Sequence, residues 1–139
     1  MTIRAFLPCI LLFSLSFLMT MRPASLYAID VAGTWSGTFF SNYPDVAPFT
    51  MTVVITRDPH GRAIGTSSLN SDCLKGAQLE ITVTGSNVVL AGSDKKGNNI
   101  TVRGTLDNTG TLLNSIYILN GSGTGGCETD NGTGTLAKR

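Results

Sequence analysis

After residue 28, apolar and polar residues alternate along most of the chain with a period of two. In the segment FTMTVVIT (49–56) the threonines share one parity, and the other parity is apolar throughout. The segments QLEITVT (78–84) and NITVRGTL (99–106) show similar alternation. Such alternation predicts β-strands that turn one face to a core and the other to water. No helical period runs for more than a turn in this region, so the sequence predicts an all-β protein.

Turn-forming residues separate these segments. The clusters carry the Asp, Asn, Pro and Gly residues that tight reversals need, and they are DPHG (58–61), GSN (85–87), DKKGN (94–98) and DNTG (107–110). The predicted strands are 31–40, 49–57, 62–69, 77–84, 87–93, 99–106, 111–119 and 132–138. Because short connections join neighbouring segments, the strands are expected to pair as an antiparallel meander.

A sheet of short strands with one apolar face can close into a barrel or fold into a sandwich. Glycines within the predicted strands favour the barrel, because such glycines often mark bends and barrel corners. These glycines are Gly33, Gly37, Gly65, Gly92 and Gly104. Closure also removes exposed sheet edges. We therefore expect an eight-stranded antiparallel up-and-down barrel, with a β-sandwich as the alternative.

The alternation also predicts which side chains fill the interior. The expected set is apolar apart from Asn114, and the rest are Trp35, Phe39, Phe49, Met51, Val53, Ile55, Leu79, Ile81, Val83, Val88, Leu90, Ile100, Val102, Leu106, Leu112, Ile116, Ile118 and Leu136. Trp35 is the only tryptophan in the chain. Its indole is expected to close one end of the barrel, where its N–H needs a hydrogen-bond partner. A barrel of this size is either packed solid or holds one small apolar cavity.

The segment GTWSG (33–37) resembles the first strand of the calycin superfamily, which comprises lipocalins, fatty-acid-binding proteins and avidins, and it is most similar to the avidin opening. The resemblance implies a closed barrel with a basic residue packed over the tryptophan, for which Lys138 and Arg139 stand at the right position. It does not imply biotin or retinoid binding, because avidins use several tryptophans and lipocalins are longer and carry a helix. The segment 121–136 (GSGTGGCETDNGTGTL) resembles the C-terminal end of small exported bacterial β-proteins of unassigned function.

The N-terminal segment has the order of features of a secretion signal. Arg4 precedes an apolar run over 5–21, and small residues follow up to Ala28. A retained membrane anchor is the alternative, although the run is short for one and contains Pro8. Cys9 does not fit a lipid-attachment site, because Pro8 precedes it and most of the apolar run follows it. We expect a signal peptide at 1–28, a single barrel domain at 29–139, and a secreted or periplasmic location.

Cys73 and Cys127 are the cysteines of the expected mature chain. In an exported protein an even pair most often forms a disulfide. Zinc is the alternative, but the chain has no CxxC motif and His60 is its only histidine. We expect a disulfide and neither a metal nor a cofactor.

The charge of the expected mature domain is close to zero. Without Arg4 and Arg22, the ten Lys and Arg residues become eight, against nine Asp and Glu. No basic stripe is present to bind phosphates along a nucleic acid, so nucleic acid is not an expected partner. We expect a monomer that does not associate with membranes after signal cleavage.

Few residues suggest catalysis. Glu128 and Asp130 could form a carboxylate pair of the glycosidase type, but they lie in a predicted loop tip where solvated carboxylates are the usual case. The same residues with Asn131 lack the spacing of an EF-hand calcium loop. His60 stands in a turn, and no serine lies in a GxSxG motif. We therefore predict a protein without enzymatic activity.

The segment SNYPDVAPF (41–49) is the connection best suited to recognition, because stiff aromatic loops at a barrel mouth are good binding surfaces. It could equally fold over the open end as a lid. The predicted function is an extracytoplasmic binding module that takes a small apolar ligand or a protein at this mouth. The candidate ligand-binding residues are Trp35, Tyr43, Phe49 and Asn114. The alternative is an interaction or inhibitor protein with a solid core and no ligand cavity.

Overall fold

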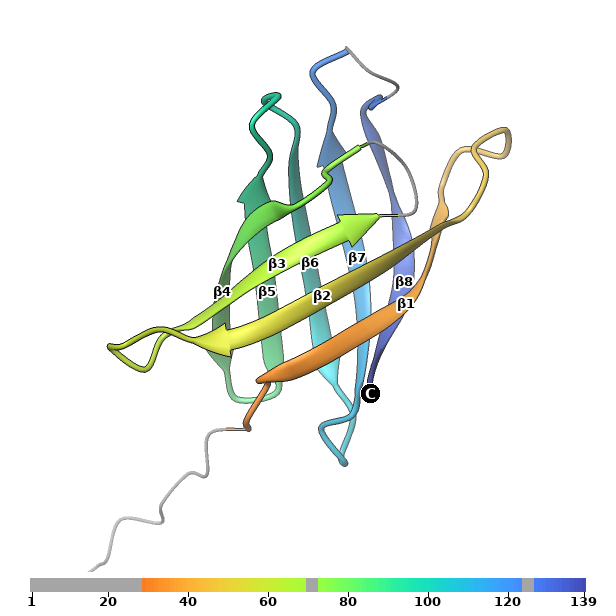
Figure 1. Cartoon of the computed structure of the whole chain (residues 1–139). Coiled ribbons are helices and arrows are strands. Elements are labelled where there is room, and N and C mark those ends of the chain that lie inside the picture. The colour runs from red at the N-terminus through yellow and green to blue at the C-terminus, as the bar shows by residue number, and fades with distance from the viewer. Residues whose placement is uncertain (1–28, 70–72, 124–126) are drawn as a thin grey trace, which may run out of the picture.

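Eight strands form one sheet in which each strand pairs with its neighbours in sequence (Figure 1). The computed structural model describes residues 29–69, 73–123 and 127–139, so the predicted signal peptide (1–28) lies outside the described residues. The strands are β1 (Gly33–Ser41), β2 (Phe49–Arg57), β3 (Ala63–Leu69), β4 (Ala77–Thr84), β5 (Asn87–Ser93), β6 (Asn99–Leu106), β7 (Leu112–Asn120) and β8 (Asp130–Lys138). The predicted strands are thus confirmed to within about two residues at their ends.

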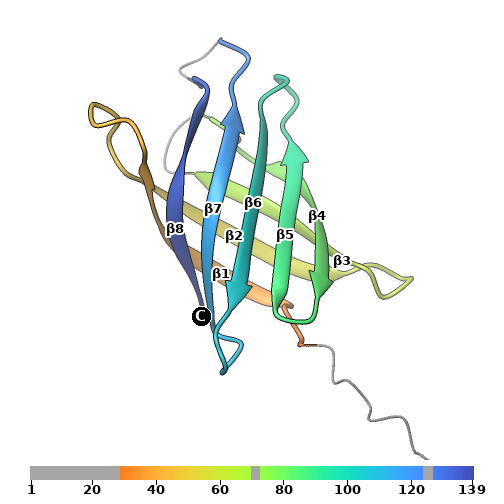
Figure 2. The ribbon, with the colours of Figure 1, turned by 180° about the vertical axis from the view of Figure 1, so that it is seen from behind.

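The sheet closes because β1 pairs with β8 as well as with β2. The β1–β8 register runs from Trp35 opposite Lys138 to Ser41 opposite Gly132. Figure 2 shows the same closed wall from behind, with β7 and β8 side by side in front. All eight pairings are antiparallel, so the predicted up-and-down barrel is confirmed and the sandwich is wrong.

Trp35 closes one end of the barrel, as predicted. Its side chain is 1% exposed, and its Nε1–H donates to the carbonyl oxygen of Val31 at 2.8 Å. The ammonium of Lys138 lies 5.8 Å from the centre of the indole ring and donates to the carbonyl oxygen of Asp30 at 3.0 Å. A cation over an indole face is attracted by the ring quadrupole. Lys138 therefore holds the position that the calycin resemblance implied, whereas Arg139 extends the strand pairing through its backbone N–H to Thr34.

The opposite end is closed by the predicted disulfide between Cys73 and Cys127, which is confirmed. It joins the β3–β4 connection to the β7–β8 connection, and Leu74 packs beside it with no exposed surface. Leu74 has a φ of 54°, a left-handed conformation that is uncommon for a leucine. Burial of this side chain offsets the cost of its backbone conformation. We call this end the disulfide end and the other the Trp35 end.

The predicted inward parity is wrong for β7. Leu113, Ser115, Tyr117 and Leu119 are buried, whereas Asn114 and the three residues Leu112, Ile116 and Ile118 are exposed. The segment LLNSIYILN carries large apolar residues on both parities, so alternation alone could not choose between them.

A glycine on β8, which pairs with β7, makes room for the inward residues of β7. Tyr117 pairs with Gly132, where an added Cβ would lie 2.8 Å from the tyrosine ring. The same Cβ would lie 1.9 Å from the carbonyl oxygen of Phe40 on β1, so glycine at 132 lets β8 approach β1 closely and also leaves the space that the Tyr117 ring occupies.

Breaking the disulfide should destabilise the barrel. The bond joins residues 54 apart, and the chain-entropy model for a loop of that length gives about 4 kcal/mol of free energy of unfolding. Urea unfolding should show this loss for Cys73→Ser, and for the unchanged protein once it is reduced. A reducing agent added to Cys73→Ser should have no further effect, and an unchanged urea midpoint on reduction of the parent would contradict the prediction.

Candidate functional site

The four candidate ligand-binding residues lie in separate parts of the barrel. Trp35 is buried near the start of β1, at the end of the barrel that it closes. Phe49 is half-buried at the start of β2, near the disulfide end. Tyr43 is 52% exposed in the β1–β2 loop. Asn114 faces outward on β7, where its side-chain oxygen accepts a hydrogen bond from Thr135 at 3.0 Å. They do not share one cavity.

The interior behind Trp35 is almost completely filled. The cavity there measures about 10 Å³ and is lined only by apolar residues, namely Val31, Trp35, Val53, Ile55, Val88, Leu90, Leu106, Leu113 and Leu136. A single ordered water needs at least about this volume and two to four polar partners. The space is therefore too small for a ligand and offers no polar group to orient one.

Aromatic rings close the core below the disulfide end. The ring of Phe49 stacks on that of Phe39, with centroids 5.4 Å apart and planes 8° from parallel. Tyr117 meets both rings edge-on, at 5.5 Å from Phe39 and 5.2 Å from Phe49. Phe49 thus serves as a core residue of this end and is not a free surface for a ligand.

A buried carboxylate lies next to these rings. Asp130 is 6% exposed, and its Oδ2 accepts a hydrogen bond from the Tyr117 hydroxyl at 2.6 Å. Its Oδ1 accepts from the Ser41 hydroxyl at 2.5 Å and from the backbone N–H of Asn131 at 2.8 Å. Ser41 in turn accepts from the backbone N–H of Tyr43 at 2.9 Å. The cluster ties the first residue of β8 to the end of β1 and to β7.

Sequence reasoning missed this cluster because it placed Asp130 in a solvated loop. β8 begins two residues earlier than predicted, and Asp130 then falls on the inward parity of that strand. Glu128, by contrast, is exposed. With one carboxyl in the core and the other in solvent, the geometry gives no support to a paired-carboxylate mechanism. The signal available in the sequence was that Asp130 shares one parity with Gly132 and Gly134, which would extend the last strand back to Asp130.

Both oxygens of Asp130 have donors, so the arrangement is suited to holding strands together. Burial, as the larger cause, and the hydrogen bond to Asp130, as the second, raise the pKa of Tyr117 well above its usual value of 10.0. The phenol therefore stays protonated and continues to donate at alkaline pH.

His60 lies exposed in the turn between β2 and β3, where its backbone N–H donates to Asp58 at 2.9 Å. Within residues 29–69, 73–123 and 127–139, no three His, Cys, Asp or Glu side chains are grouped as metal ligands would be. The same residues form no helix with the length and hydropathy that a membrane span requires.

Large apolar side chains are exposed on the outer wall of β1 and β7, the two strands that pair with β8. Figure 2 shows β7 and β8 side by side. Phe40 is 55% exposed and Ile116 is 54% exposed, and both pair with Thr133, which lies between them on β8. Ile118, 50% exposed, lies beside Asn131 in the adjacent row. We call these residues, Phe40, Ile116, Ile118, Asn131 and Thr133, the β7–β8–β1 face.

The β1–β2 loop continues this face beyond the sheet. It leaves β1 after Ser41, and its Tyr43 and Val46 are 52% and 42% exposed. The side chain of Asn42 donates to that of Asn131 at 2.6 Å, which fixes the base of the loop against β8. The loop therefore carries two exposed apolar side chains from a base that is held against Asn131 of this face.

No protein-family model matches this chain, and no curated protein is similar to it at a significant level. The closed eight-stranded antiparallel barrel is consistent with a calycin-like fold. The likeness rests on architecture and on Trp35 with its overlying Lys138.

The raised pKa of Tyr117 predicts a loss of stability at high pH. Below pH 10 the phenol is protonated in both the folded and the unfolded chain, and its contribution is fully present. Above pH 10 only the unfolded chain loses the proton, so the free energy of unfolding should fall by up to about 1.4 kcal/mol per pH unit. Urea unfolding between pH 8 and pH 11 measures this slope.

Tyr117→Phe should be less stable at neutral pH, because Asp130 loses one donor, and should show a shallower decline above pH 10. Tyr43→Phe is the matched control, since Tyr43 is exposed and should leave the decline unchanged. Equal slopes for Tyr117→Phe and the parent protein would contradict the assignment.

Proposed function

We propose that this protein is a non-enzymatic binding module of an extracytoplasmic compartment, and that its partner is a protein docked on the β7–β8–β1 face and the β1–β2 loop. The observation that carries the proposal is the contrast between a filled interior and exposed apolar side chains on one part of the wall. The cavity behind Trp35 measures about 10 Å³, whereas Phe40, Ile116 and Ile118 are each at least half exposed.

The disulfide supports the choice of compartment. Disulfides persist in oxidising surroundings such as the periplasm or the cell exterior and are rare in the cytosol. The Cys73–Cys127 bond and the predicted signal peptide point to the same surroundings.

The charge pattern of the face indicates the chemistry of its partner. β1 and β7 contain no charged residue, and the charged residues of β8 are the buried Asp130 and the terminal Lys138. Arg103, opposite Ile116 on β6, is the nearest exposed charge along that row. The face therefore fits a partner surface that is apolar and hydroxyl-rich, as the centres of protein interfaces are depleted in charge.

The size of the face requires the loop to take part. Three strands of nine residues, at about 3.3 Å per residue and about 4.8 Å between strands, present a wall of about 400 Å². A standard interface buries about 800 Å² on each partner. We infer that Tyr43 and Val46 supply part of the remaining contact.

A carrier of small apolar ligands is the competing function, and Trp35 reports on it directly. Because the interior is filled, a panel of lipophilic probes should produce no saturable change in the fluorescence of Trp35, the only tryptophan in the chain. A saturable response to any probe, abolished by enlarging Val53 to phenylalanine at the cavity wall, would instead support a carrier.

The docking surface is tested by removing its apolar side chains. Phe40→Ser with Ile116→Ser should abolish capture of a partner cross-linked to the protein in its native compartment, and Tyr43→Ala should weaken the affinity at least about fivefold, as expected for an interface aromatic. The matched control is Val54→Ser with Ile64→Ser, which removes two residues that are 46% and 41% exposed on β2 and β3.

The control variant should capture the partner as the parent protein does, and all variants should keep the parent melting temperature. Equal capture by the Phe40 and Ile116 variant, or an equal loss in the control, would contradict docking on this face.

A further inference from the structure

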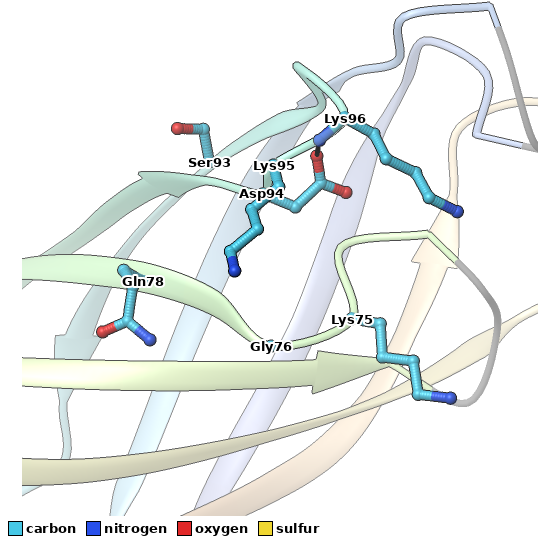
Figure 3. Close-up of a pocket in the computed structure, with 7 residues that line it drawn as sticks. All are labelled: Lys75, Gly76, Gln78, Ser93, Asp94, Lys95 and Lys96. Atoms are coloured by element: carbon cyan, nitrogen blue, oxygen red, sulfur yellow. Dashed lines mark hydrogen bonds between the residues drawn. The ribbon is translucent and has the colours of Figure 1, made fainter.

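Three lysines from two separate connections line one cleft at the disulfide end (Figure 3). Lys75 belongs to the β3–β4 connection, and Lys95 and Lys96 form the turn between β5 and β6. In Figure 3, Lys95 points toward Gln78, whereas the side chains of Lys75 and Lys96 point together in the other direction, away from Gln78. The cleft has a volume of about 690 Å³, and Gln78 and Ser93 line its sheet side.

Within the part of the chain that the structure describes, no carboxylate forms an ion pair with these lysines. The ion pairs among the described residues are Arg57 with Asp30 and Arg62 with Asp58, at the other end of the barrel. All three lysines are exposed and lie outside both pairs.

The one acidic side chain that lines the cleft is already occupied. One carboxylate oxygen of Asp94 accepts from the backbone N–H groups of Lys96 and Asn98, at 2.8 Å and 3.0 Å. Its other oxygen accepts from the side-chain amide of Asn98 at 2.8 Å. The carboxylate thus shapes the turn that carries two of the lysines, and it does not pair with their ammonium groups.

The framework beneath the lysines is fixed. Asn98 is 1% exposed, and its side-chain oxygen accepts from the backbone N–H and the hydroxyl of Ser122 in the β7–β8 connection. On the other side of the cleft, the buried Leu74 precedes Lys75 and anchors that connection in the core. Both connections therefore hold the backbone of their lysines at the edge of one cleft before any ligand arrives, which reduces the ordering cost of binding.

We propose that this cleft binds an oxyanion of the phosphate class with two or more negative charges, either free in solution or as the headgroup of an anionic lipid. The volume lies within the range of about 300–1,000 Å³ typical of ligand sites. Lysine binds phosphate as a compact point charge, and lysines on two connections match a ligand whose charges are spread over more than one group. The Gln78 amide and the Ser93 hydroxyl add neutral hydrogen bonds at the sheet side. This site is separate from the β7–β8–β1 face and does not rest on it.

Inorganic pyrophosphate is the soluble probe. Titration should shift the backbone amide NMR signals of Gly76, Gln78, Ser93 and Lys95 with one saturable curve, and added NaCl should weaken the binding because exposed charges are screened. Lys75→Gln, and Lys95→Gln with Lys96→Gln, should each weaken the affinity, by up to about fivefold per lysine removed. Arg103→Gln is the matched control: it removes the same charge from the outer wall of β6 and should leave the affinity unchanged.

Vesicles distinguish the two sources of the anion. Sedimentation of the protein with phosphatidylglycerol vesicles, but not with neutral phosphatidylcholine vesicles, would identify a lipid headgroup. The lysine variants should abolish this sedimentation. Saturable pyrophosphate binding without sedimentation would identify a free phosphate compound.

The proposal is overturned if neither probe binds, or if the lysine variants bind as the parent does. It is equally overturned if Arg103→Gln weakens binding as much as they do. Because the substituted side chains are all exposed, an unchanged melting temperature confirms that each variant is folded.

Discussion

The pairing of β1 with β8 is the interaction on which this structure depends. It converts an open eight-stranded sheet into a closed wall, so no strand is left with an unpaired edge. The backbones come close along this seam: a Cβ at Gly37 would lie 1.7 Å from the carbonyl oxygen of Thr135. The same register puts Lys138 opposite Trp35 and Gly132 opposite Ser41. Closure thereby positions both the cation over the indole and the space for Tyr117.

The parts of the fold that depend on local pattern could be predicted from the sequence. Strand positions and the inward Trp35 followed from alternation and turn residues, barrel closure from the glycines within the strands, and the disulfide from the cysteine count. The inward parity of β7 could not be predicted, because its apolar residues occupy both parities. Gly132, which leaves room for the inward Tyr117, lies on another strand. The burial of Asp130 was missed for the same reason: where β8 begins is set by its pairing with Leu119, and composition alone does not show it.

The candidate site was harder to predict than the fold. The residues chosen from sequence were spread over both ends and the outer wall, because parity says which way a side chain points but not which strand end it stands at. Once the ends are placed, the interior is a packed core, so the recognition surfaces that we propose lie outside it. The wall across β7, β8 and β1 is nearly free of charge, and three lysines outside the ion pairs of the described residues line one cleft at the disulfide end. These surfaces suit two different classes of partner.

The seam also has a consequence for biosynthesis. Its two strands are the first and the last of the barrel to be synthesised, so contacts such as Trp35 with Lys138 can form only after all eight strands have been made. Contacts between distant parts of a chain are slow to form, and incomplete chains expose strand edges that promote aggregation. A chain of this protein that lacks β8 is therefore held open by its own topology, and the edges of its sheet remain available to neighbouring copies until β8 is added.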